Sequence, residues 1–214
     1  LTWDDVKIVE FGGFGDSWAG MINGDVDAAF ASTNSGKVYE AENGPRGVVI
    51  PPIDPNNKEG LPRMQEIAPF FSPMNATVGA TIDGKQPRPT AGYAYPVLIA
   101  MADQDPDLVY NMTKAMVDLF DVYDGNAPGI SGWSKDKQNF SWVVPYHDGA
   151  VRYWKEIGLW TDEANAHNDN LMKRQAALRA AWDQLSSQNP ENWEEAWDKA
   201  RRDALKAGGF GVVF

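Results

Sequence analysis

The sequence predicts an α/β chain in which a parallel sheet flanked by helices is followed by two C-terminal helices. Three observations support this class. Short β-branched or small-residue runs alternate with helix-like segments over residues 6–50, a strong helix start follows at residues 105–107, and residues 165–214 carry apolar side chains at spacings of four and three. The first pattern is typical of βαβ units, and the last of one helix packed on another.

Residues 6–11 form the first predicted strand, which enters a turn at residues 12–15. Asp16 is the expected N-cap of a helix that carries Trp18 and ends at Gly24. Residues 26–31 and 47–50 are the next two predicted strands, and residues 32–35 between them offer another helix cap.

The middle of the chain starts with a Pro-rich loop over residues 51–62 and a short helix near residues 61–69. Residues 73–89 are expected to be irregular or hairpin-like, with Asp83-Gly84 as the turn. A long strand is predicted over residues 93–102. Asp105-Pro106-Asp107 then combines an N-cap, a proline at the first helical position and an acid in the first turn, which predicts an amphipathic helix.

Residues 144–159 are the most informative segment, and they predict a strand end, a polar turn and a short helix. Asp148 is the expected N-cap and Gly158 the left-handed terminal residue. Beyond it, apolar residues at spacings of four and three predict a helical hairpin over residues 165–214. We expect its second helix to start at residues 189–191 and to end at Gly208-Gly209, and its tryptophans to be buried.

Composition excludes several function classes. The chain has 214 residues, a net charge of −11 and no cysteine. A strongly acidic chain is poorly suited to nucleic acid or an anionic membrane surface, and no apolar run approaches the roughly 18 residues of a membrane span. Without cysteine there are no disulfides or thiolate chemistry, and two histidines cannot build a His-rich metal site. We expect no cofactor, although a carboxylate-only metal site stays open.

Three sequence blocks carry a resemblance to a known family. Residues 144–159 closely resemble the Pro-x-His-x-Gly-Ala-x-x-Tyr-aromatic-x-Glu-x-Gly-Leu signature of the TAXI (TRAP-associated extracytoplasmic immunogenic) solute-binding proteins. Residues 3–9 followed by residues 18–30 are similar to the strand, helix and Gly-x-apolar-Asp-Ala-Ala-Phe strand of that family, and residues 93–99 with 107–115 form a third block. The blocks together span roughly residues 1–160 in the expected order.

The resemblance implies a two-lobed receptor of the type II periplasmic-binding-protein fold. Residues 1–143 would be the second α/β lobe, incomplete at its N-terminus, residues 144–164 the return to the first lobe, and residues 165–214 a hairpin extension that the family core does not need. The chain would then be the C-terminal portion of a periplasmic receptor whose N-terminal lobe is supplied in cis or in trans. It would capture a small organic solute, an amino acid or a carboxylate, and deliver it to TRAP transporter membrane subunits without acting as an enzyme.

Six residues are candidate solute contacts. Ser32, Thr33 and Asn34 follow a predicted strand at the edge where open α/β sheets bind ligands, although helix capping is the simpler role for them. Tyr93 and Tyr95 alternate along a strand and so share one face, although aromatic packing would explain them as well. Phe14 lies in a glycine-rich turn before a helix, and this turn is either an anion site or an ordinary tight turn.

Two other functions, and the roles of four more residues, remain open. His147 is expected to satisfy backbone groups at a turn, with solute contact or catalysis as lesser possibilities. A small acid/base hydrolase could use Asp25 and Asp27, and a partner-binding module could act through the C-terminal helical hairpin. Trp133, Phe140 and Trp142 suit either a core or a cleft.

Overall fold

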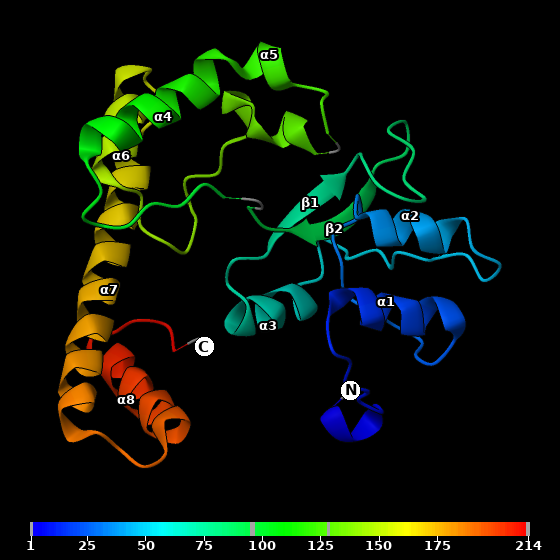
Figure 1. Cartoon of the computed structure of the whole chain (residues 1–214), viewed down its shortest axis with the longest axis horizontal. Coiled ribbons are helices and arrows are strands. Elements are labelled where there is room, and N and C mark those ends of the chain that lie inside the picture. The colour runs from blue at the N-terminus through cyan, green and yellow to red at the C-terminus, as the bar shows by residue number, and fades with distance from the viewer. Residues whose placement is uncertain (1, 95–96, 128, 213–214) are drawn as a thin grey trace. The chain divides into compact units, whose positions relative to one another are not determined.

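The computed structural model describes residues 2–94, 97–127 and 129–212 and separates into two compact units (Figure 1). The first comprises Leu1–Asn57 and Pro73–Gly92, and the second Lys58–Ser72 and Tyr93–Phe214. The domain boundaries expected from the resemblance stay a prediction.

The first unit contains the helices α1 (Phe14–Asn23) and α2 (Gly36–Glu42), a short 3₁₀ turn at Trp3–Asp5, and a small sheet. Its buried core consists of Trp18, Val38, Ala41 and Ala80. Gly24 ends α1 as predicted, with a φ of 92° and a backbone N–H that reaches the carbonyls of Gly20 and Met21. The N-cap is Gly13 and not Asp16, so α1 begins three residues earlier than predicted, and the Asp16 carboxylate lies in its first turn.

The only sheet among the described residues pairs β1 (Ser72–Ala76) with β2 (Arg88–Gly92). The predicted hairpin is confirmed, because Asp83 and Gln86 form an antiparallel bridge across Gly84 and Lys85, so that the turn starts at the expected Asp83-Gly84. The Asp83 carbonyl accepts a hydrogen bond from Gln86 N at 2.8 Å, and its side chain accepts one from Lys85 N at 2.9 Å.

The predicted parallel strands are wrong for the described residues. Residues 6–11, 26–31, 47–50 and the described part of 93–102 contain no strand. A parallel strand needs a hydrogen-bonded neighbour and a cover on both faces. Here Ile8, Phe30 and Val49 are 63%, 68% and 80% exposed, while Ala29, Ala31, Val48 and Ile50 pack on the core. Residues 26–31 and 47–50 are therefore covered on one face only, and no strand ladder forms along the three runs.

The second unit is helical. It contains α3 (Gly60–Ile67), α4 (Pro106–Asp118), α5 (Phe120–Tyr123), two 3₁₀ turns (Ile130–Trp133 and Lys135–Lys137), α6 (Asp148–Glu156), α7 (Asp162–Gln188) and α8 (Trp193–Ala207). The start of α4 is confirmed, since the Asp105 carboxylate accepts a hydrogen bond from Asp107 N at 2.8 Å. None of the described helices combines the length and the hydropathy needed to cross a bilayer.

Helix α6 packs directly against α4. Its N-cap is His147 and not Asp148, because His147 Nδ1 accepts a hydrogen bond from Gly149 N at 3.1 Å. This confirms that His147 serves the backbone at a turn. Gly158 follows the helix with a φ of 74°, as predicted. Buried Tyr153, Trp154, Trp160 and Ala164 join α6 to the start of α7 in an aromatic core.

The predicted helical hairpin is confirmed as α7 and α8, and Figure 1 shows α8 alongside the C-terminal half of α7. Asn189 ends α7 in the left-handed region, so α8 starts later than expected, where Asn192 Oδ1 accepts a hydrogen bond from Glu195 N. Leu171 and Leu185 of α7 and Leu205 of α8 are buried. Trp182 and Trp193 are 45% and 38% exposed, so their expected burial is wrong. The Trp182 ring packs on those of Trp193 and Trp197, next to the turn that joins the two helices.

Candidate functional site

The predicted polar loop lies in the first unit and is tied to residues 78–80. The Thr33 hydroxyl donates to the Val78 carbonyl at 2.9 Å, and the Thr33 carbonyl accepts from Ala80 N at 2.9 Å. Gly79, with a φ of 141°, lets the two loops approach, because a Cβ there would lie 2.5 Å from the Thr33 carbonyl oxygen. Thr33 therefore has a structural role, and its hydroxyl proton is already used.

Ser32 and Asn34 keep more hydrogen-bonding capacity for a solute. The Ser32 hydroxyl donates to Asn34 Oδ1 at 2.7 Å, which fixes the orientation of the amide. Within the described residues the Asn34 NH₂ group makes no hydrogen bond, so two donors remain. Neither side chain caps α2, since the N-cap is Ser35 and it forms no side-chain cap bond. The capping role that sequence reasoning assigned to one of residues 32–34 is thus wrong.

Phe14 is the first residue of α1, and its exposed ring lies 6.5 Å from that of buried Trp18. Trp18 Nε1 donates to the Phe30 carbonyl at 3.1 Å, which ties the helix of Phe14 to the chain two residues before Ser32. The Asp16 carboxylate lies near Gly12 at the start of α1, where an anion would have to approach. This favours the ordinary tight turn over an anion site.

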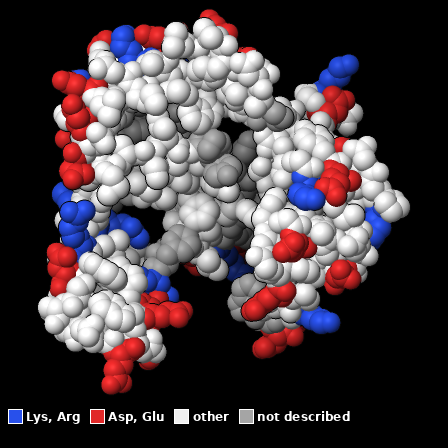
Figure 2. Space-filling model, viewed as in Figure 1, with Lys and Arg blue, Asp and Glu red and all other residues white. Residues whose placement is uncertain are grey.

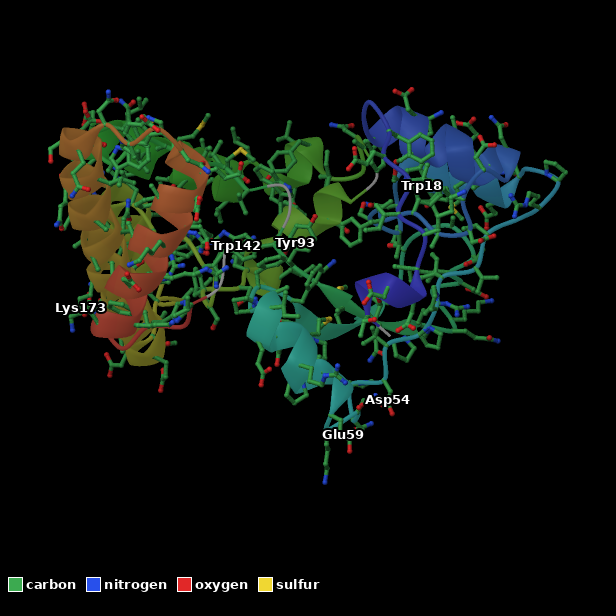
Figure 3. The ribbon with its side chains drawn as sticks, turned by 90° about the horizontal axis from the view of Figure 1, so that it is seen from below. Trp18, Asp54, Glu59, Tyr93, Trp142 and Lys173 are labelled. Atoms are coloured by element: carbon green, nitrogen blue, oxygen red, sulfur yellow. The ribbon has the colours of Figure 1, made fainter. Side chains whose placement is uncertain are left out.

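Tyr93 belongs to the second unit and contacts three other aromatic side chains. Its ring lies 5.7 Å from Phe70, 5.3 Å from Phe71 and 6.3 Å from Trp142, and it is nearly parallel to that of Trp142, at 14°. Figure 3 shows Tyr93 and Trp142 next to one another. We call Phe70, Phe71, Tyr93 and Trp142 the aromatic quartet. Tyr93 is 37% exposed and can offer part of its ring to a solute. Tyr95 lies outside the described residues.

The candidates thus form two clusters, one in each unit. Phe14 and residues 32–34 belong to the first and Tyr93 to the second. Sequence reasoning missed Phe70 and Phe71 and left Trp142 between core and cleft. The adjacent phenylalanines after Pro69 were the available signal, but no local pattern connects them to residues 93 and 142.

The surroundings of the acidic residues give no support to acid/base chemistry. Asp25 and Asp27 are exposed, and no group of three or more His, Cys, Asp or Glu side chains among the described residues could hold a metal ion. A large pKa change lies elsewhere, where burial raises the pKa of the Tyr146 phenol to about 12. On the face shown in Figure 2, Lys and Arg are interspersed with Asp and Glu and form no broad basic area.

Comparison with known proteins gives one match. Residues 1–158 match the model of the NMT1-like family. This segment contains both clusters and ends at Gly158. Helix α7 and helix α8 follow it. No curated protein and no solved structure matches the chain.

Proposed function

We propose that this chain, which belongs to the NMT1-like family, is the solute-binding part of an extracytoplasmic receptor. The family is related to periplasmic solute-binding proteins, and the match over residues 1–158 is the observation that carries the proposal. The receptor captures a small organic solute and releases it chemically unchanged. The TAXI resemblance of residues 144–159 supports delivery to TRAP transporter membrane subunits in the periplasm.

The free polar groups of the first unit suit an amino acid or a carboxylate. The Asn34 NH₂ group offers two donors, and the exposed Ser32 hydroxyl can still accept a hydrogen bond. Both are small, so they can hydrogen-bond a solute without filling the space around it. In a two-lobed receptor the preceding lobe completes this surface, and the solute favours the closed state because it contacts both lobes.

The test begins with the small molecules that travel with the native protein. Protein purified from its host without denaturant is heated, and the released molecules, called the native extract below, are identified by mass spectrometry. One organic solute should be enriched over an unrelated protein purified in the same way. An extract without any enriched compound, together with no binding to a panel of amino acids and carboxylates, would contradict the proposal.

Asn34→Ala provides the site-specific arm. Loss of the two amide donors should lower the affinity for the enriched solute about tenfold, which corresponds to about 1.4 kcal/mol. Asn56→Ala is the matched control, because Asn56 is an exposed loop residue of the same unit whose side chain makes no hydrogen bond to any residue that the structure describes. Equal affinities of the two variants would remove Asn34 from the site.

A partner-binding role of the hairpin is the second candidate, favoured by the exposure of Trp182 and Trp193. Removal of residues 175–214 separates the two functions, since it keeps the first turns of α7, which contribute Ala164 to the aromatic core. Solute binding should survive this truncation if the receptor role is correct. A partner that binds through the hairpin should be lost.

A further inference from the structure

Helix α7 holds the backbone of the segment that carries Trp142. His167 Nε2 lies 2.6 Å from the Trp142 carbonyl oxygen, and Asn168 Oδ1 accepts a hydrogen bond from Tyr146 N at 2.8 Å. A carbonyl oxygen can only accept, so His167 must carry its proton on Nε2. Adjacent residues of α7 therefore satisfy one acceptor and one donor that lie four residues apart on the same segment.

These two bonds fix the register of the segment as well as its distance from α7. A shift by one residue would break both of them and leave partly buried backbone groups unpaired, which typically costs about 1–3 kcal/mol for each group. The rings of Phe140 and Tyr146 add to this anchorage, because they lie 5.3 Å from Trp154 and from Trp160 respectively. The backbone on both sides of Trp142 is therefore fixed.

The Trp142 side chain does not take part in that anchorage and joins the aromatic quartet. Its ring lies 6.3 Å from those of Tyr93 and Phe70. The backbone carbonyl of Trp142 is hydrogen-bonded to His167, and the ring of the same residue stacks beside Tyr93. The hydrogen bond to His167 therefore helps to place the ring. His167 and Asn168 both lie beyond residues 1–158, the segment that matches the family.

We propose that His167 and Asn168 are positioning residues, which hold the Trp142 ring beside Tyr93 in a solute-contacting surface of the second unit. The C-terminal helix, outside the family-matched segment, thereby adjusts which solutes the receptor accepts. The functional half of this inference rests on the proposed function. The positioning of Trp142 does not, and it is measurable in the absence of any solute.

The test uses fluorine NMR of the native full-length protein labelled with 5-fluorotryptophan. The chain has nine tryptophans, and Trp142→Phe assigns the resonance of Trp142. His167→Leu and Asn168→Ala should shift or broaden that resonance and leave most of the others in place. His167→Gln keeps an N–H at similar reach and should restore it, and so should Asn168→Asp, which keeps the acceptor oxygen.

Lys173→Ala is the control on the same helix, because Lys173 is exposed and lies away from Tyr93 and Trp142 (Figure 3). An unchanged Trp142 resonance in both His167→Leu and Asn168→Ala would overturn the positioning role. So would equal changes at all tryptophans, or a failure of both conservative variants to restore the resonance.

Titration with the native extract tests the functional half. The extract should shift the Trp142 resonance of the wild type, and His167→Leu should require at least tenfold more extract for the same shift. If the extract binds the protein but leaves Trp142 unchanged, the quartet is not part of the solute site and the inference fails. If the extract does not bind at all, the proposed function fails, while the positioning result stands on the solute-free spectra.

Discussion

Replacement of Gly149 by alanine should destabilise the second unit by separating α6 from α4. An alanine Cβ at this position would lie 2.3 Å from the Pro106 carbonyl oxygen, 2.9 Å from Tyr110 N and 3.0 Å from Val109 Cβ. The first two are backbone atoms of α4, which cannot rotate away as a side chain can. Since ordinary contact begins near 3.4 Å, the helices would have to move apart by roughly 1 Å at this point.

The size of the effect follows from two opposing contributions. Overpacking against a rigid neighbour typically costs about 1–3 kcal/mol and sometimes more. The better helix propensity of alanine offsets at most about 1 kcal/mol. Separation also strains the hydrogen bond of 2.6 Å between the Tyr110 hydroxyl and Glu156 across the two helices. The net loss in the free energy of unfolding should therefore be about 2 kcal/mol or more.

Urea unfolding followed by circular dichroism measures this loss. Gly132→Ala is the control within the same unit, because a Cβ at Gly132 would meet nothing within 4 Å and the variant should stay within about 0.5 kcal/mol of the wild type. A Gly149→Ala protein that is as stable as this control would refute the argument that Gly149 is required for the close approach of α4 and α6.

Three further predictions concern loops, caps and pH. Gly79→Ala should lower the melting temperature of the first unit, because a positive φ and a contact of 2.5 Å with the Thr33 carbonyl both oppose a side chain; an unchanged melting curve would contradict it. His147→Ala should cost about 1 kcal/mol in urea unfolding, while His147→Asn should keep the cap and change solute affinity less than tenfold; equal losses would exclude the capping role. Burial raises the pKa of Tyr146 from 10.0 to about 12, so the folded protein holds this proton where the unfolded chain has lost it. The Tyr146 phenol therefore contributes about 2–3 kcal/mol to the free energy of unfolding. This contribution is fully present below pH 10 and is lost between pH 10 and pH 12. When urea midpoints are measured from pH 9 upward, the midpoint of Tyr146→Phe should fall less than that of the wild type. An identical fall in both proteins would assign the loss of stability to other groups.

The sequence predicted the features that depend on a few neighbouring residues. Asp105 caps α4, Gly24 and Gly158 end their helices, and Asp83-Gly84 forms the hairpin turn, because each requires only local hydrogen bonds or one special φ angle. The spacing of apolar residues by four and three likewise predicted α7 and α8.

The features that were missed depend on partners distant in the chain. The apolar runs at residues 6–11 and 26–31 have strand-like composition, but composition does not supply a hydrogen-bonded neighbour. The sequence could not predict the aromatic quartet either, since Phe70, Tyr93 and Trp142 come from three separate segments of the chain. Of the candidate site, Asn34 and Tyr93 keep capacity for a solute, while the Thr33 hydroxyl is bonded within the fold.

The central claim is that the protein binds a small solute and returns it unchanged. It is tested most directly by calorimetric titration of the native protein with the compound enriched in the native extract, followed by mass analysis of that compound after incubation. The account predicts saturable binding of one molecule per chain, with the compound recovered at its original mass. Conversion of the compound into a product, or the absence of saturable binding, would contradict the account.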